Sequence, residues 1–309
     1  MNKYNLYKED LKVAKQITNS YAKTYSIGIK MFPKEIQNAT HSLYLFVRLT
    51  DNIIDETNKT IEDAKIELTN WINNWNHYYY HNTHENPSYR LLKQLITDYQ
   101  IPIKLIDDFN NSMIRDTNQN RYESYQELKE YMHGSAEIIG LIMARILEAD
   151  PHDYEAAKAL GEAFQLTNFI RDIKEDYQKR NRIYIPNNIL IKHNSSHKDI
   201  EQLTLTPELQ NTLKYIINYN RTLYHQARQG IHSIHPKTQF PLLLAINLYE
   251  AILDKIEKEN YNIFNKRIQT NTIDKIIVYW KTKLKFKISK SKYYYKTIKN
   301  FENFENNSQ

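Results

Sequence analysis

Apolar residues spaced as on helices run through almost the whole of this chain and constrain its fold more than any other feature. We expect helices near residues 4–30, 34–56, 60–81, 87–99, 103–118, 124–148, 153–179, 207–233, 239–260 and 272–285. Pro33, Pro102, Pro151 and Pro241 fall near predicted helix starts, where a missing amide hydrogen costs little. Because no convincing strand-like alternation interrupts the series, the sequence predicts an all-α bundle whose inner helices surround a central cavity.

Nothing in the sequence marks a boundary between domains. The 309 residues include only five Gly and eight Pro, and no Gly/Ser-rich or Pro-rich linker occurs. We therefore expect a single all-α domain over residues 1–285, followed by a basic C-terminal tail over residues 286–309. The lack of a Gly-rich loop also argues against a Rossmann or P-loop nucleotide site.

The C-terminal region is strongly basic. From Lys281 to Lys299 there are eight lysines and no acidic residue, with Leu284, Phe286 and Ile288 between them. This region could be a solvated extension, or it could lie on a membrane surface, where each lysine near anionic lipid contributes about 1 kcal/mol and aromatic residues favour the interface. A nucleic-acid partner is not expected, because no recognised binding motif accompanies the charge.

Cysteine usage and the N-terminal sequence bear on the compartment. The chain has no cysteine, which excludes disulfides, thiolate metal sites and a cysteine nucleophile, and which fits a reducing compartment. The first twenty residues lack the apolar core of a signal peptide, and no stretch has the 18 or more apolar residues of a membrane span. We expect a cytoplasmic protein, either soluble or peripheral on a membrane surface, and the sequence predicts no oligomeric state.

Two pairs of aspartates share the same spacing. Asp51 and Asp55 form the first pair, and Asp172 and Asp176 form the second. Residues four positions apart lie one above the other on a helix, so each pair points two carboxylates in one direction. Such spacing is only slightly more frequent here than chance would give, and a solvated acidic helix face would show it too.

The surroundings of both pairs favour a function over a solvated face. Apolar residues lie on both sides of the first pair, and near the second pair Gln165, Asn168 and Asp172 form one polar stripe on the expected helix. Carboxylates gathered inside a helical protein raise one another's pKa unless cations neutralise them. Magnesium fits this need, with manganese as a substitute, because it takes oxygen ligands and completes its shell with water and substrate phosphates.

Basic residues accompany the acidic pairs. Arginine is suited to two-pronged contacts with phosphate oxygens. The side chains that could bind a diphosphate in this way are Arg48, Arg171, Arg180, Arg182, Lys266 and Arg267.

Two segments resemble the squalene and phytoene synthases, a family whose members join two prenyl diphosphates head to head. Residues 165–186 (QLTNFIRDIKEDYQKRNRIYIP) are similar to the family's second aspartate-rich signature almost from end to end, and residues 44–55 (YLFVRLTDNIID) resemble the first. Weaker similarity covers residues 22–26, Tyr131, Tyr249 and residues 261–267. Together these segments span about residues 20 to 270, which is most of the chain.

The resemblance implies a single isoprenoid synthase domain and a set of site residues. It implies magnesium ligands at Asp51, Asp55, Asn168, Asp172 and Asp176. It implies catalytic roles for the same four aspartates and for Arg48, Arg171, Tyr44, Tyr131 and Tyr249. The substrate-binding residues that it implies are Thr24, Tyr25, Arg48, Gln165, Asn168, Arg171, Arg182, Lys266 and Arg267.

The resemblance also implies a reaction, in which a cyclopropylcarbinyl diphosphate forms first and then rearranges to a linear 1′–1 product. Phytoene from two geranylgeranyl diphosphates is preferred, because residues 264–267 resemble phytoene-type sequences and no long hydrophobic C-terminal anchor is present. Squalene or dehydrosqualene from farnesyl diphosphate is the first alternative, and NADPH is needed only if squalene is the product. A non-catalytic, membrane-associated assembly or lipid-binding protein of the same fold is the second.

Three positions depart from the family pattern. Glu137 stands where members usually have Gly, Asn181 replaces the Gly usual before Arg182, and Asn52 follows Asp51 where many members have a second Asp. A glutamate near the expected substrate channel could narrow the pocket, change substrate choice or impair the reaction. None of the three changes removes the four principal carboxylates.

Overall fold

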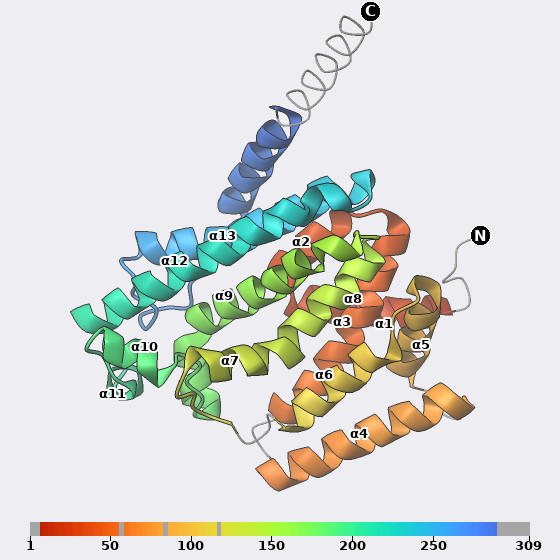
Figure 1. Cartoon of the computed structure of the whole chain (residues 1–309), viewed down its shortest axis with the longest axis horizontal. Helices are drawn as coiled ribbons and strands as arrows, with labels where there is room; N and C mark the ends of the chain where they lie inside the picture. The colour runs from red at the N-terminus through yellow and green to blue at the C-terminus, as the bar shows by residue number, and fades with distance from the viewer. Residues whose placement is uncertain (1–6, 56–58, 83–85, 116–118, 289–309) are drawn as a thin grey trace, which may run out of the picture.

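The structure is a computed structural model that describes residues 7–55, 59–82, 86–115 and 119–288, without the side chains of residues 23–25 and 55. All of its regular elements within these ranges are helices, arranged as one bundle (Figure 1). The helices are α1 (Lys8–Tyr21), α2 (Lys23–Met31), α3 (Lys34–Asp55), α4 (Ile61–His81), α5 (Pro87–Tyr99), α6 (Ile103–Arg115), α7 (Tyr125–Met132), a π-helical turn (His133–Glu137), α8 (Ile138–Ile146), α9 (Tyr154–Arg180), α10 (Asn187–Lys192), α11 (His197–Glu201), α12 (Pro207–Gln229), α13 (Pro236–Lys258) and a last helix over residues 272–288.

Local side-chain chemistry sets several helix starts. The hydroxyl of Thr60 accepts a hydrogen bond from the amide of Asp63 at the start of α4, and Thr206 does the same for α12, where Pro207 is the first helical residue. Ser124 caps α7 in the same way. These caps satisfy amide hydrogens that have no partner within the helix, so the loops before them end where the sequence places Ser or Thr.

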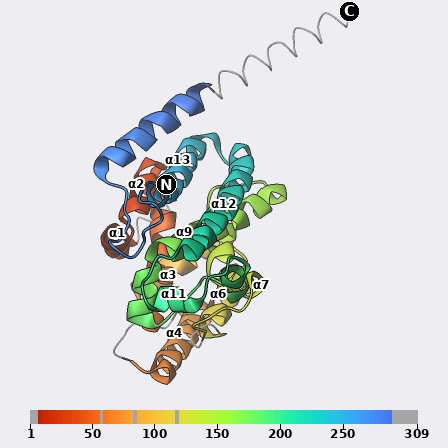
Figure 2. The ribbon, with the colours of Figure 1, turned by 90° about the vertical axis from the view of Figure 1, so that its left-hand side faces the viewer.

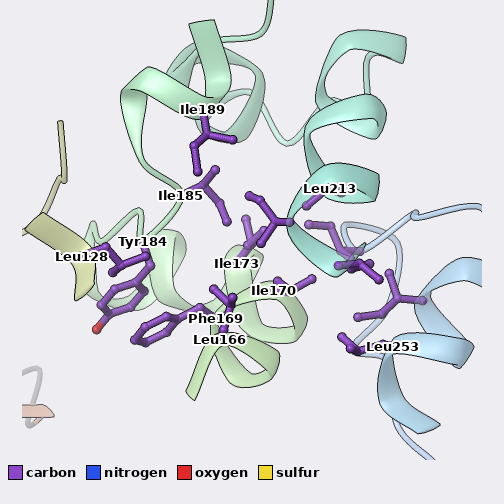
Figure 3. Packing of buried hydrophobic residues seen from close by; sticks show 14 of the residues in the cluster. Leu128, Leu166, Phe169, Ile170, Ile173, Tyr184, Ile185, Ile189, Leu213 and Leu253 are labelled. Carbon is purple, nitrogen blue, oxygen red and sulfur yellow. The ribbon is translucent and has the colours of Figure 1, made fainter. Parts of the chain in front are cut away.

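The bundle is built around two apolar clusters. The first surrounds α9 and includes Phe169, Ile170 and Leu213, which are labelled in the close-up of Figure 3. The second lies between α3, α4, α5, α6 and α8 and includes Phe46 and Trp75. Fully burying one such side chain contributes about 1.5–3 kcal/mol, so these clusters account for much of the driving force for folding. They leave the facing sides of α3 and α9 free to line a site.

Glycines allow one close contact between helices. A Cβ added at Gly161 of α9 would lie 2.3 Å from the carbonyl oxygen of Ala136, and a Cβ at Gly140 of α8 would lie 2.3 Å from that of Ala157. Only glycine permits such an approach of two backbones. The π-helical turn before α8 therefore packs directly on α9, which runs through the middle of the molecule when it is seen from the side (Figure 2).

The all-α, single-domain prediction is confirmed, and several boundaries are corrected. The helix expected at 4–30 breaks at Ala22 (φ −114°, ψ 54°), and the helix expected at 124–148 is divided by the π-helical turn. Two short helices, α10 and α11, were not predicted. Pro236 rather than Pro241 begins α13, and Pro241 lies inside it. Across the described residues, none of the helices combines the length and apolar character that crossing a bilayer requires.

Candidate active site

A cavity of about 800 Å³ lies between the two apolar clusters, with α3 on one wall and α9 on the other. It is lined by side chains from both ends of the sequence. The lining residues that the sequence singles out are Tyr44, Arg48, Asp51, Tyr131, Gln165, Asn168, Arg171, Asp172, Asp176, Arg180, Arg182, Tyr249 and Arg267.

The α3 wall presents one face of a helix to the cavity. Tyr44, Arg48 and Asp51 follow one another at intervals of four and three residues, so their side chains lie on one stripe. The Arg48 guanidinium lies over the ring of Tyr21, 4.2 Å from its centroid. Within the described part of the chain, nothing accepts a hydrogen bond from the buried Nε of Arg48. An anion in the cavity would satisfy this donor.

Helix α9 has a polar face toward the cavity and an apolar face on its opposite side. Gln165, Asn168, Asp172 and Asp176 all line the cavity, whereas the opposite face, with Ile170, belongs to the first apolar cluster. This is the stripe expected from the sequence. The second face holds α9 in the core, so the polar side chains project from a rigid support.

Asp172 is the most strongly paired acid of the site. Arg171 contacts both of its carboxylate oxygens, with Nε 2.9 Å from Oδ1, and Arg267 approaches the same oxygens at 3.0 and 3.2 Å. Burial would raise the pKa of Asp172, but the hydrogen bonds and charges of the two arginines outweigh it and lower the pKa below its usual value. Asp172 is therefore ionised throughout the physiological pH range.

Further charges extend along α9 toward its C-terminus. Arg180 contacts Asp176 at 3.1 Å, and Glu175 pairs with Lys179 at 2.6 Å and with Arg267 at 3.5 Å. The hydrogen bond from Lys179 is the main cause that lowers the pKa of Glu175. Acidic and basic side chains thus alternate along this wall, which suits a ligand that brings both anionic oxygens and cations.

Aromatic rings form the apolar part of the lining. Phe169 and Tyr184 are stacked, with ring centroids 3.8 Å apart and an interplanar angle of 10°, and the ring of Tyr131 lies 5.8 Å from that of Tyr184. Across the cavity, burial raises the pKa of Tyr44 to about 12, and burial also raises the pKa of Tyr249. These phenols therefore stay neutral at physiological pH, and their faces can stabilise a nearby cation.

The donor set of the cavity fits magnesium. Asp51, Asp172 and Asp176 supply carboxylate oxygens and Asn168 an amide oxygen, and cysteine is absent from the sequence. Among the described side chains, no three acids or histidines come close enough to hold one ion by themselves. Magnesium does not require this, because one or two carboxylates hold it and water and substrate phosphates complete its shell.

Four predicted residues are not placed in the cavity by the described structure. Lys266 lies outside it, beside a separate surface hollow, where its side chain is 65% exposed and pairs with Glu259 at 3.1 Å. The side chains of Thr24, Tyr25 and Asp55 lie outside the part of the chain that the structure describes.

The structure adds residues that the sequence did not single out. Glu175 and Lys179 follow Asp172 on the same helical face, so the spacing that identified the aspartates could have found them. Tyr21 comes from the end of α1 and Lys275 from the helix at 272–288, and both reach the cavity only through tertiary packing. No local sequence pattern distinguishes these two residues.

Glu137 does not face the cavity. Its side chain is 7% exposed and its carboxylate lies 2.8 Å from Nδ1 of His133, one turn earlier in the π-helical turn. The described lining of the cavity therefore gives no support to the hypothesis that Glu137 narrows the pocket. That contact also provides the buried carboxylate with a partner, which a buried acid requires.

Comparison with known proteins identifies the family. Residues 18–274 match the family described as squalene/phytoene synthase. The chain is 29% identical over 269 residues to a chloroplastic phytoene synthase of an Oncidium hybrid, covering 85% of this chain but 65% of that one. It is 28% identical over 282 residues to the 15-cis-phytoene synthase of Synechocystis, covering 87% and 83% of the two chains.

Solved structures share the fold. A dehydrosqualene synthase superposes with a TM-score of 0.82 at 22% identity, covering 92% of this chain and 99% of that one. A squalene synthase from Alicyclobacillus acidocaldarius gives a TM-score of 0.74 at 22% identity and covers 83% and 96%. Because the family match covers most of the chain, including both aspartate pairs, this protein belongs to the squalene/phytoene synthase family.

Proposed function

We propose that this protein joins two prenyl diphosphates head to head in a magnesium-dependent reaction, with geranylgeranyl diphosphate as substrate and phytoene as product. The observation that supports this most is the cavity itself, where the carboxylates of α3 and α9 face one another among arginines and beside neutral aromatic rings. An arrangement of this kind can bind a diphosphate at one end and shelter a carbocation at the other.

Four arginines would bind the diphosphate and stabilise it as it departs. Arg48 has a buried donor without an acceptor among the described residues, and Arg171, Arg182 and Arg267 line the same cavity. Negative charge on a departing diphosphate increases in the transition state, so donors fixed in advance stabilise that state more than the bound substrate. Arg171 is held by α9, whereas Arg267, 49% exposed, lies on a loop and can follow its ligand.

Asp51, Asn168, Asp172 and Asp176 would hold the magnesium ions, with Asp55 one turn beyond Asp51 on α3. When bound, magnesium would neutralise diphosphate oxygens and so assist ionisation. The aspartates lie on two walls, so ions held by both would join α3 to α9 across the substrate.

The aromatic side chains would protect the allylic cation. Tyr131, Phe169 and Tyr184 present neutral ring faces, and Ile54, Met113 and Ile252 add apolar side chains that would help a bound prenyl chain to exclude water. Excluding water matters because a carbocation that meets it is hydrolysed to an alcohol. The double bond of a second prenyl diphosphate held against the same surface would instead attack this cation, and loss of a proton from the new cation would close the ring of the cyclopropylcarbinyl diphosphate. That diphosphate would then ionise in turn and rearrange.

The choice of geranylgeranyl diphosphate is supported by the names of the relatives. The plant and cyanobacterial proteins compared above are phytoene synthases, at 28–29% identity. The two solved structures compared above are of dehydrosqualene and squalene synthases, which keeps farnesyl diphosphate as the alternative substrate.

The test is incubation of the purified chain with labelled geranylgeranyl or farnesyl diphosphate, with and without magnesium and NADPH, followed by chromatography of the extracted hydrocarbons. We expect phytoene from geranylgeranyl diphosphate, dependent on magnesium and independent of NADPH. If only farnesyl diphosphate gives a product, as squalene or dehydrosqualene, then the substrate is farnesyl diphosphate and not geranylgeranyl diphosphate. If no hydrocarbon forms from either substrate, the proposed reaction is wrong.

A further inference from the structure

The helix over residues 272–288 is fastened to the bundle along one face. Thr282 is 1% exposed and accepts a hydrogen bond from Asn247 of α13 at 2.9 Å. On the same face, the rings of Tyr279 and Phe286 lie 5.9 and 5.6 Å from that of Phe240. These contacts fix the rotation of the helix about its axis, and therefore fix which side chains point outward.

The opposite face carries a continuous apolar stripe in solvent. Positions 273, 277, 280, 284 and 288 follow one another at intervals of three and four residues, so their side chains form one row along the helix. The exposed fractions are 67% for Ile273, 46% for Ile277, 59% for Trp280, 63% for Leu284 and 49% for Ile288. Five neighbouring large apolar side chains in water need an explanation, unlike apolar residues scattered singly over a surface.

Lysines lie on both sides of the stripe. By helical geometry, Lys281 and Lys285 lie along one edge, and Lys283 and Lys287 along the other. The single acidic residue of this helix, Asp274, is paired with Lys255 of α13. An apolar row between two rows of positive charge is the pattern of a helix that lies in the plane of a membrane interface.

We propose that residues 272–288 dock this protein on an anionic lipid bilayer, with the apolar stripe in the boundary between headgroups and acyl chains. The lysines would then lie at the level of the lipid phosphates. A second copy of this chain fits the surface less well, because stripe-to-stripe pairing would bring the flanking lysines of two helices together without acidic partners.

Docking in this orientation would bring the cavity close to the membrane. Lys275 of this helix and Thr270 just before it both line the cavity. The docked surface and the cavity therefore share one segment of chain. The described residues show no membrane-spanning helix, so this attachment would be peripheral and reversible.

The test uses the full chain and sedimentation with vesicles of phosphatidylcholine, alone or mixed with phosphatidylglycerol, without substrate. We expect binding to the mixed vesicles and at least tenfold weaker binding to the neutral ones. Emission from Trp280 should shift to shorter wavelength on binding, because Trp280 is 59% exposed whereas Trp75 is fully buried already.

Variants separate the two contributions. Replacing both Ile277 and Leu284 by Asp should weaken vesicle binding by about 100-fold or more, because each change removes an apolar side chain that the membrane would bury. Replacing Lys281 and Lys285 by Gln should weaken it by about 30-fold, from about 1 kcal/mol for each lysine. Ile66→Asp is the matched control, since Ile66 is 58% exposed on α4, and it should bind as the unchanged chain does.

Three results would overturn the inference. They are equal binding to neutral and mixed vesicles, unchanged binding by the Ile277/Leu284 variant, and equal loss in the Ile66 variant. A dimer in analytical ultracentrifugation that the Leu284→Asp change converts to a monomer, with vesicle binding intact, would assign the stripe to a second copy. Circular dichroism of each variant excludes unfolding as the cause, and none of these residues lines the cavity.

Discussion

Replacement of Asp172 by Asn tests the charge arrangement of the site most directly. The carboxylate accepts hydrogen bonds from Arg171 and Arg267 at both oxygens. Asn keeps one acceptor and turns an NH₂ group toward one donor of each guanidinium. A hydrogen bond to a charged group contributes about 1.5–3 kcal/mol. Arg171 is 17% exposed and bears most of this loss, whereas Arg267 is 49% exposed and is screened by solvent.

We therefore expect Asp172→Asn to lower the free energy of unfolding by about 2 kcal/mol, which corresponds to a fall in melting temperature of roughly 3 °C for a chain of 309 residues. Turnover should fall by about 1000-fold, because the change removes a proposed metal ligand and disturbs Arg171. Differential scanning fluorimetry measures the first effect, and labelled prenyl diphosphate turnover at 25 °C measures the second.

A matched control distinguishes the site from ion pairs in general. Asp254 of α13 pairs with Arg221 at 2.8 Å, but it is 55% exposed and lies outside the cavity, and Arg221 also contacts Glu257. Asp254→Asn should leave turnover unchanged and shift the melting temperature by about 2 °C at most. Near-normal turnover of Asp172→Asn, or an equal loss in both variants, would refute the proposed role of Asp172.

The same variant has a defined pH dependence. The pKa of Asp172 is lower in the folded state than in the unfolded chain, so its pairing stabilises the fold above the unfolded pKa of about 4. This contribution is lost as pH falls through the folded pKa, because the folded state must then take up a proton as well. The difference in unfolding free energy between the unchanged chain and Asp172→Asn should be constant from neutral pH to about pH 5 and shrink below the unfolded pKa.

Three further outcomes follow from other parts of the fold. Gly161→Ala should lower the free energy of unfolding, measured in urea, by about 1–3 kcal/mol, because the new Cβ would lie 2.3 Å from a backbone oxygen. Gly28→Ala is the comparison, since its new Cβ would lie 3.0 Å from another Cβ, and it should lower the free energy of unfolding by less than half as much. Burial, followed by the charges of nearby lysines, lowers the pKa of His41 to about 4, so His41 stabilises the fold above pH 6.5 and progressively less as pH falls. The loss between pH 7 and pH 5 should be about 2 kcal/mol and should be absent in His41→Gln. Glu137→Gln should leave the length of the hydrocarbon product unchanged, because Glu137 does not line the cavity; a product of different length would contradict this placement.

Helix positions could be predicted wherever periodicity is local. The expected helices at 34–56 and 87–99 correspond to Lys34–Asp55 and Pro87–Tyr99. The break at Ala22 has neither Gly nor Pro to announce it, and the π-helical turn depends on contact with Gly161 of another helix. The π-helical turn packs on α9, and a one-dimensional pattern does not record such a tertiary contact.

Residues of the candidate site could likewise be predicted where they belong to a local sequence pattern. Asp51, Asp172 and Gln165 could be found because each lies on a periodic polar stripe or in a resembling motif. Tyr21 and Lys275 come from elements near opposite ends of the sequence and meet the cavity only in the folded chain. Lys266 shows the converse error of sequence reasoning, since it neighbours Arg267 in the chain yet lies outside the cavity.

The alternation of acids and bases on α9 has a physical consequence for binding. Asp172 and Asp176 are paired with Arg171, Arg267 and Arg180, so neither of these two carboxylates is buried without a compensating charge. In the proposed reaction, a diphosphate that arrives with magnesium would offer oxygens to the arginines and a cation to the aspartates. Binding would then exchange one set of ion pairs for another, which reduces the desolvation cost. Neither the anion nor the cation alone permits this exchange, and we therefore expect the two to bind with positive cooperativity, measurable by titrating a non-hydrolysable prenyl thiodiphosphate with and without magnesium.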